Sequence, residues 1–150
     1  MQSFLRDLFF YHHHFSPLLI NLVEQHEALI PAQTVGLLSH IFNAHQIWNA
    51  RILGEAPNGV FQEHAFDVCR AMELQNHQTT LEILDAVDLS NLIRYTNTKG
   101  QTFENSVRDI LFHVANHTTH HRGQIVAAVR QVGGEPFASD FILFAREKLV

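Results

Sequence analysis

The chemistry available to this sequence centres on histidine. The chain has 12 histidines in 150 residues, and four of them are His113, His117, His120 and His121. Residues four apart on a helix lie one turn apart along the axis and about 40° apart around it. His117 and His121 can therefore direct two imidazoles at one point about 2.0–2.1 Å from each nitrogen, as zinc requires. This spacing predicts two ligands of a divalent metal ion.

A simpler interpretation must be weighed against the metal. A helical histidine is usually a surface residue or a hydrogen-bonded core residue, and chance pairs at this spacing are common in a chain with 12 histidines. A site also needs a third ligand from another helix. His40 and His45 are the candidates, but they lie about 140° apart around their helix, so both cannot reach one ion. Geometry leaves the choice between them open.

Four long helices are expected to position these side chains. Apolar periodicity predicts them over Ser3–Leu29, Gln33–Leu53, Phe61–Ala86 and Ser106–Val132. Pro17 should disturb the first helix and Pro31 should end it. Gly54 should end the second, and Ser106 should cap the fourth with Asp109 three residues on.

The inward faces of two helices follow from the same periodicity. On the second helix, Leu37, Ile41, Ala44 and Trp48 form one stripe that should face the core. The third helix has a longer inward series, namely Phe61, Ala65, Val68, Cys69, Met72, Thr79 and Ile83. Each series predicts side chains buried between helices.

The remaining segments complete the fold. Two short alternating stretches, Leu92–Thr96 and Gln101–Phe103, flank the turn Asn97–Gly100 and predict a small hairpin or an extended loop. The tail Pro136–Val150 is apolar enough to pack back on the helices, through Phe137, Phe141, Ile142 and Phe144. We expect an all-α four-helix bundle forming one domain over residues 1–150. Periodicity does not fix its connectivity.

Two segments resemble the DinB family of damage-inducible proteins. They are Leu38–Gly54 (LSHIFNAHQIWNARILG) and His113–Ile125 (HVANHTTHHRGQI), with the most specific part at Asn116–Gln124; the resemblance extends to Tyr11-His12-His13. It implies a bundle with up-down-down-up connectivity, usually a homodimer. It also implies a metal, commonly zinc or nickel, on one histidine of the second helix and two of the last. By motif position these ligands are His40, His117 and His121.

The function expected of such a site is catalytic. Three neutral imidazoles leave a fourth metal position for water or substrate. The wider superfamily that the chain resembles includes bacillithiol and mycothiol S-transferases and a mycothiol-dependent isomerase. This implies a low-molecular-weight thiol, activated by the metal for attack on a small electrophilic substrate. Hydrolysis is a weaker possibility, since no H-E-x-x-H motif is present. The alternatives are a non-catalytic dimeric bundle with a structural or adventitious metal, and a stress-response binding module.

Composition excludes other classes. The formal charge is −5 with no block of Lys or Arg, which argues against a nucleic-acid partner. No apolar run reaches the roughly 18 residues that span a bilayer. The start of the chain lacks the pattern of a secretory signal, and the single cysteine, Cys69, allows no internal disulfide. These features predict a cytoplasmic protein in which Cys69 is a core residue.

Several polar residues near the expected site have two interpretations. Asn43, Asn116 and Gln124 could orient ligand imidazoles, although an ordinary surface amide is the preferred interpretation for each. His113 and His120 either shuttle protons or simply pack and face solvent.

Two further groups lie outside the expected site. Arg122 either binds an anionic substrate group or pairs with a carboxylate across the bundle. His12, His13 and His14 should point in three directions, so we expect no separate metal site there.

Overall fold

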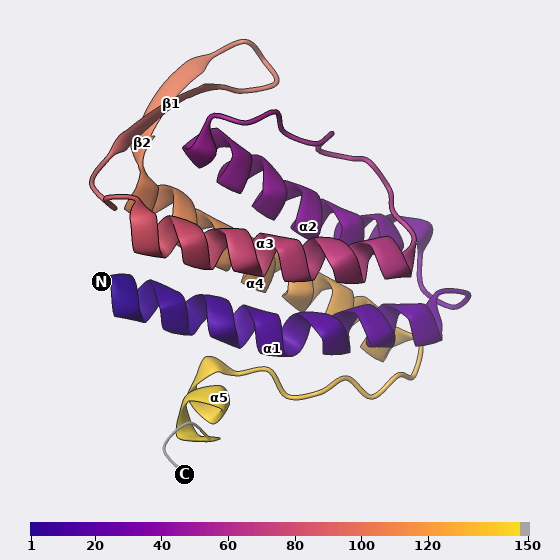
Figure 1. Ribbon diagram of the computed structural model, residues 1–150. Helices are drawn as coiled ribbons and strands as arrows, with labels where there is room; N and C mark the ends of the chain where they lie inside the picture. Colours follow the sequence, from indigo (N-terminus) through magenta and orange to yellow (C-terminus); the bar gives the residue numbers. More distant parts are fainter. Residues whose placement is uncertain (148–150) are drawn as a thin grey trace.

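The computed structural model describes residues 1–147 and is mostly helical (Figure 1). This confirms the expected helical fold, with one small antiparallel sheet. In chain order the elements are α1 (Gln2–His26), α2 (Ala32–Leu53), α3 (Phe66–Ala86), β1 (Leu92–Thr96), β2 (Thr102–Ser106), α4 (Val107–Gln131) and α5 (Phe141–Glu147).

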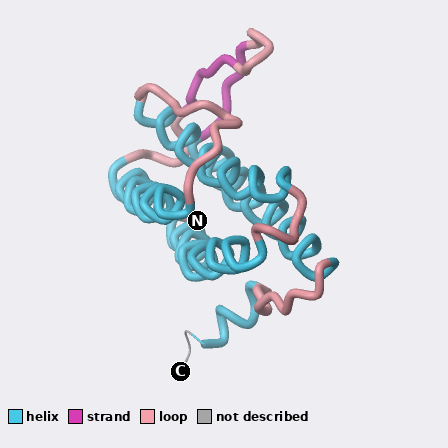
Figure 2. The backbone as a smooth tube through the Cα atoms, turned by 90° about the vertical axis from the view of Figure 1, so that its right-hand side faces the viewer, coloured by secondary structure: helices cyan, strands magenta, loops and turns pink. Residues whose placement is uncertain are grey.

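The long helices pack in a definite pattern. α1 packs against α3 and α4, α2 packs against the same two helices, and α1 and α2 scarcely touch. In Figure 1, α1 and α4 run from left to right, whereas α2 and α3 run from right to left. The hairpin and α5 lie on opposite sides of the helices in both Figure 1 and Figure 2. α2 and α4 are therefore neighbours, as a site shared between them requires.

The predicted helix ends are mostly correct. Gly54 ends α2 with a φ of 74°, a left-handed conformation that glycine adopts at little cost. The Ser106 hydroxyl caps α4 by accepting a hydrogen bond from the backbone N–H of Asp109 at 3.1 Å. α1 is continuous through Pro17 and ends at His26, three residues before the predicted end. The predicted hairpin is confirmed, with Thr96 opposite Thr102 beside its turn.

The inward face of α3 was predicted correctly only in part. Ala65 and Val68 are exposed, the latter by 42%, whereas Cys69 and Ile83 are buried as expected. The face between them is polar and buried instead, and consists of Glu73, Asn76, His77 and Thr80. Polar partners explain this, because the Asn76 amide donates to the carbonyl of Phe42 at 3.0 Å and no buried side-chain N or O within residues 1–147 lacks a hydrogen bond.

Buried polar residues form a middle layer between two apolar clusters. One cluster includes Ile20, Leu38 and Ile125, and the other includes Phe9 and Leu111. Along each long helix, most buried polar residues fall between these clusters in the sequence; Thr34 and Ser39 on α2 are the exceptions within residues 1–147. Those between the clusters are His12 and Ser16 on α1, Asn43 and Asn49 on α2, Glu73, Asn76, His77 and Thr80 on α3, and Thr118 and Arg122 on α4. The protein therefore has buried polar groups near the middle of its long helices. The predicted ligands His117 and His121 lie in the same part of α4.

The tail packs back on α1 as expected. Phe137 stacks on Phe15, and both Phe141 and Phe144 contact the ring of Tyr11 edge-on. Ile142 is 57% exposed, so this predicted contact is wrong. The last three residues of the predicted tail, 148–150, lie outside the described part of the chain. Within residues 1–147 no helix is both long and apolar enough to cross a membrane.

Candidate metal centre

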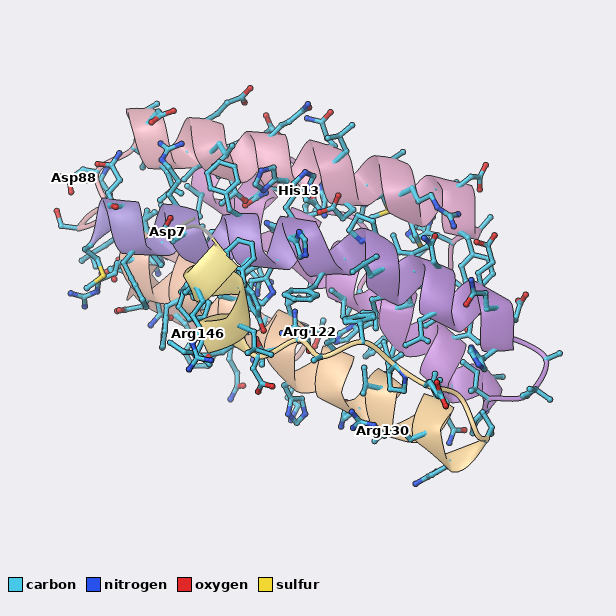
Figure 3. The ribbon with its side chains drawn as sticks, turned by 90° about the horizontal axis from the view of Figure 1, so that it is seen from below. Asp7, His13, Asp88, Arg122, Arg130 and Arg146 are labelled. Carbon is cyan, nitrogen blue, oxygen red and sulfur yellow. The ribbon has the colours of Figure 1, made fainter. Side chains whose placement is uncertain are left out.

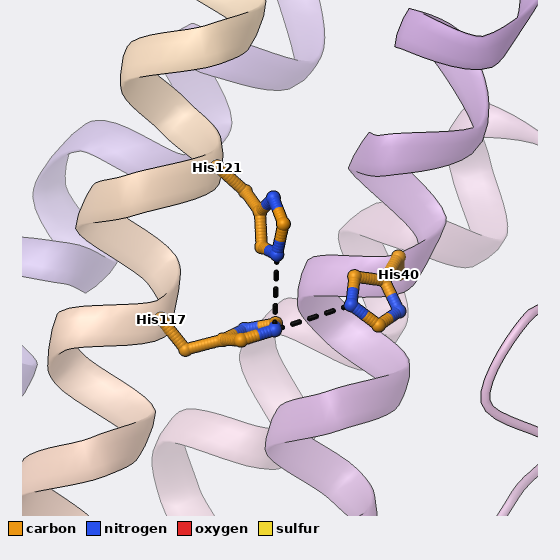
Figure 4. A group of neighbouring side chains, drawn as sticks. All are labelled: His40, His117 and His121. Atoms are coloured by element: carbon orange, nitrogen blue, oxygen red, sulfur yellow. Dashed lines mark hydrogen bonds between the residues drawn. The ribbon is translucent and has the colours of Figure 1, made fainter.

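α2 and α4 bring three histidines together at their interface (Figure 4). The Nε2 atom of His117 lies 3.1 Å from Nε2 of His40 and 3.1 Å from Nε2 of His121. One ligand atom from each residue lies within 4.8 Å of the other two. We call these residues the three-histidine group; they are the three that the DinB resemblance implied as ligands.

The hydrogen bonds of Nδ1 in His40 and His121 indicate which ring nitrogen carries the hydrogen. Nδ1 of His40 lies 3.2 Å from the carbonyl oxygen of Val60, and Nδ1 of His121 lies 2.6 Å from Oε1 of Gln124. A carbonyl oxygen can only accept, so each neutral ring carries its hydrogen on Nδ1 and directs a lone pair from Nε2. The single hydrogen that His117 could hold on Nε2 cannot satisfy both neighbours. The group therefore has more lone pairs than hydrogens, which suits a cation at its centre.

The spacing of the nitrogens fits a metal ion. Bonds of 2.0–2.1 Å in a tetrahedral site put two ligand nitrogens about 3.3–3.4 Å apart. The two observed separations of 3.1 Å differ from that by only a few tenths of an ångström. Imidazole ligands suit zinc, nickel, copper and iron. The three-histidine group could thus hold a metal ion after a small movement of its side chains.

The electrostatics keep two of these rings neutral. Burial, followed by the neighbouring His121 and His40, lowers the pKa of His117 to about 3. Burial also lowers the pKa of His121 from its usual value. Since a histidine must be neutral to bind a metal, both rings are in the ligand form at neutral pH.

The segment before α3 holds His40 in place, and the sequence did not predict it. The third helix was expected from Phe61, but α3 begins at Phe66, and the preceding residues form a turn at Val60 and Phe61 followed by irregular backbone. Side chains of α2 form hydrogen bonds with the backbone of this segment. The Asn43 amide donates to the carbonyl of Gln62 at 2.7 Å, and the Ser39 hydroxyl accepts from the N–H of His64 at 3.0 Å. These bonds replace the first turn of the predicted helix.

Phe61 also differs from its expected place. It was predicted to face the core, but its side chain is 83% exposed. Its ring stacks on that of His40, with centroids 5.5 Å apart and planes 15° apart. Phe61 therefore covers one face of a candidate ligand rather than filling the core.

A cavity of about 310 Å³ lies beside the three-histidine group. His40 and His121 form part of its wall, and Glu63 is the acidic residue in its lining. Oε1 of Glu63 lies 3.4 Å from where a Cβ on Gly36 would be, which is an ordinary van der Waals distance. The remaining wall residues are Gln33, Leu37 and Phe61. The site thus has room for a small molecule next to the candidate ligands.

The other candidate histidines lie elsewhere. Nε2 of His45 is 2.7 Å from the Thr80 hydroxyl, on the α3 side of α2, so the structure places His40 and not His45 with the pair on α4. His113 packs edge-on against Trp48, with its ring centroid 5.7 Å from that of His117. His120 is exposed, with its centroid 5.0 Å from that of His121.

Among the three amides, the preferred surface interpretation is wrong for Asn43, which is fully buried, whereas Gln124 is exposed but contacts a candidate ligand. Its Oε1 accepts from the ring of His121, and its position three residues after that histidine on one helix could have indicated the contact. Asn43 acts one step further out: its amide donates to the carbonyl of Gln62 before α3, and its Oδ1 lies 2.8 Å from Nε2 of His64. Asn116 is exposed and lines a different cavity.

Two other expectations are confirmed. His12, His13 and His14 do point apart: His12 is buried against α4, His13 contacts Glu73 of α3, and His14 is exposed. Cys69 is fully buried, and burial raises the pKa of its thiol. A reactive thiolate at this position is therefore disfavoured.

Comparison with known proteins gives one match. No curated protein and no solved structure shows a significant similarity to the chain. The sequence profile of the DinB family matches residues 31–148, a range that contains all three members of the three-histidine group and leaves α1 outside. The match covers well over half of the chain, so this protein belongs to the DinB family.

Proposed function

We propose that this protein is a metal-dependent enzyme that binds one divalent ion, zinc or nickel, on His40, His117 and His121. Its reaction is the transfer of a low-molecular-weight thiol to a small electrophilic substrate. The observation that supports this most directly is the convergence of three Nε2 atoms whose lone pairs exceed their hydrogens. The adjoining cavity of about 310 Å³ gives a fourth metal position access to small molecules.

Each part of the site has a role in this proposal. The ion, when bound, would supply a Lewis acid that lowers the pKa of a thiol or water toward neutrality. The carbonyls of Val60 and Gln124 hold the His40 and His121 rings in one tautomer. Leu37 and Phe61 offer apolar contacts to the substrate, and Glu63 offers an acceptor for a cationic or N–H group.

Further features of the DinB resemblance are proposed with it. The four long helices would form the up-down-down-up bundle, which the helix directions in Figure 1 support. The whole chain, residues 1–150, would form one domain that assembles as a homodimer. A cytoplasmic location remains a prediction from the sequence, and the negative charge still argues against a nucleic-acid partner.

The test combines metal content with turnover. Protein purified without an affinity tag should contain about one metal ion per chain, because one three-histidine group is present within residues 1–147. Glutathione, cysteine and bacillithiol are each mixed with 1-chloro-2,4-dinitrobenzene, and conjugate formation is followed by absorbance. His121→Ala should lose both metal and turnover, whereas His120→Ala, a matched change at an exposed neighbour, should keep both. Equal turnover in wild type and His121→Ala would contradict the proposal.

A structural metal is the second candidate function. The three-histidine group joins α2 to α4, so a bound ion would cross-link two helices far apart in the sequence. In that case chelation should lower the melting temperature while none of the thiols gives turnover. A catalytic site predicts turnover that chelation abolishes and added metal restores.

A further inference from the structure

A second candidate site lies on the other side of α4, around Arg122. This side chain is only 3% exposed and lies between α1 and α4, beside the chain that leads to α5 (Figure 3). Its Nη2 donates to the hydroxyl of Tyr11, and its Nη1 lies 3.5 Å from Nδ1 of His12. Both partners are neutral groups, and no ion pair within residues 1–147 includes Arg122. Within this part of the chain, Arg122 meets a carboxylate only at longer range, through its electrostatic interaction with Asp140 of the tail.

A buried guanidinium without an anion in direct contact is costly. Removing a charge from water costs several kcal/mol unless an opposite charge and hydrogen bonds compensate. Arg122 has five N–H donors, and its protein contacts engage only part of this set. Its guanidinium carbon also lies 4.7 Å from the centre of the Tyr11 ring, which offers some compensation but no negative charge. The remaining donors suit a bound anion.

The space for such an anion is present. A cavity of about 550 Å³ lies between α1, α4 and the tail, and Arg122 forms part of its wall. Arg130 adds a second cation to the lining and Asp140 adds one carboxylate. The hydroxyl of Tyr11 donates to the carbonyl of Ser139, which fastens the tail over the cavity. The lining thus has an excess of positive charge at a place enclosed on three sides.

The walls indicate the rest of the ligand. Phe4, Phe112, Val126 and Phe141 line the cavity together with the polar groups, so its surface is mixed. A volume of this size accommodates a small organic molecule rather than a bare ion. The planar fork of arginine matches the two oxygens of a carboxylate.

We propose that this cavity binds a small organic carboxylate, with its anionic group on Arg122 and an apolar or aromatic body against the phenylalanine rings. The site is separate from the three-histidine group, because none of those three residues lines it. Arg122 follows His121 directly on α4, so the two side chains project about 100° apart around the helix. A carboxylate bound here contacts a different face of α4 from the candidate metal.

Titration calorimetry with phenylacetate tests the proposal, using phenylacetamide as the neutral analogue of the same shape. Phenylacetate should bind the full chain saturably at about one per chain, and phenylacetamide should bind at least about tenfold more weakly, since charged hydrogen bonds are lost. Arg122→Met keeps most of the side-chain volume and should weaken phenylacetate at least about tenfold. Arg108→Met, a matched change at an exposed arginine of the same helix, should leave binding unchanged.

Two further variants keep the test decisive. A carboxylate could also ligate a metal, so phenylacetate is titrated into His121→Ala; binding should persist, whereas loss would place the ligand at the three-histidine group and overturn the proposal. Asp140→Asn removes the competing carboxylate from the lining and should tighten binding. Unchanged or weaker binding in Asp140→Asn, equal affinity for acid and amide, or wild-type affinity in Arg122→Met would each overturn it.

Discussion

Histidines gather in two regions of this protein, and the hydrogen bonds of the two regions differ. The three-histidine group lies between α2 and α4, with its Nε2 atoms facing one another at 3.1 Å. The second region, between α1, α2 and α3, contains His13, His45 and His77, which we call the core histidines. There Nε2 of His45 meets a threonine hydroxyl at 2.7 Å, and Nδ1 of His13 meets the carboxylate of Glu73 at 2.9 Å.

The comparison shows what separates a candidate metal site from a polar core. In the core region each nitrogen named above has a hydroxyl or a carboxylate beside it, and His13 and His77 stack with centroids 4.0 Å apart. In the three-histidine group, carbonyl oxygens accept hydrogen bonds from Nδ1 of His40 and Nδ1 of His121. The Nε2 lone pairs of these two rings face His117, which has at most one hydrogen to donate to them. The number of histidines is similar in the two regions. The difference lies in the balance of donors and acceptors.

Removing one residue from each region should have the largest and most unequal effect. His117→Ala should lose stoichiometric metal, because the two remaining imidazoles cannot fill a site that needs three protein ligands. His45→Ala should keep the metal although its fold is less stable. Metal content after dialysis, measured by mass spectrometry, checks both variants. A full complement of metal in His117→Ala, or its loss in a folded His45→Ala, would erase the distinction between the regions.

Gln124 tests whether the carbonyl acceptor matters to the metal. Gln124→Leu removes the acceptor from Nδ1 of His121 and should weaken metal affinity about 10–100-fold, the usual cost of losing such an outer partner. Gln131→Leu, at another exposed glutamine of α4, is the control and should have wild-type affinity. Competition with a fluorescent zinc chelator measures the change. Equal affinities in the two variants would mean that Gln124 does not orient the ligand.

Acid should destabilise the core region in the metal-free protein. Burial lowers the pKa of His45 to about 3 and that of His77 to about 4, from 6.5. The unfolded chain therefore takes up protons first, so stability is full above pH 6.5 and falls as the pH decreases toward 4. Each such histidine contributes a slope of at most about 1.4 kcal/mol per pH unit.

Urea unfolding between pH 7 and 5.5 measures this slope, and His45→Gln should reduce it. Glu73, whose pKa is raised mainly by burial, contributes a slope of the opposite sign. Both proteins keep Glu73, so the difference between their slopes reports His45. An unchanged slope in His45→Gln would show that this ring does not hold a neutral form in the folded state.

Phe61 should give the smallest effect. Its ring stacks on His40 but is largely exposed, so Phe61→Ala should weaken metal binding only about twofold, near the lower limit for aromatic pairs. Phe103→Ala, at a partly exposed ring of the hairpin, should leave metal affinity unchanged. The same chelator competition compares them. A loss of tenfold or more in Phe61→Ala would assign this ring a larger part in positioning His40.

The sequence predicted what depends on local spacing. The pair on α4, the Ser106 cap, the glycine at the end of α2 and the hairpin turn all involve residues within a few positions of each other. Gln124 belongs to this class too, since it lies one turn from His121. The choice of His40 over His45 needed the family resemblance, because geometry on one helix could not decide it.

The parts that were predicted wrongly depend on distant partners. The non-helical segment after Gly59 is held by Asn43 and Ser39 of α2, which lie 19 and 25 residues before their partners in the sequence. The buried face of α3 is polar because Asn49 and Phe42 of α2 supply hydrogen-bond partners. Apolar periodicity carries no information about such contacts, so it placed Phe61 and Val68 inward when both are exposed.

X-ray absorption at the zinc edge of zinc-loaded protein tests the central claim most directly. We predict three imidazole nitrogens at about 2.0–2.1 Å and one further light ligand, with a sulfur at about 2.3 Å replacing that ligand when a thiol is added. His45→Ala should give the same spectrum. A fourth imidazole, or a first shell that does not change with thiol, would contradict an open site on His40, His117 and His121.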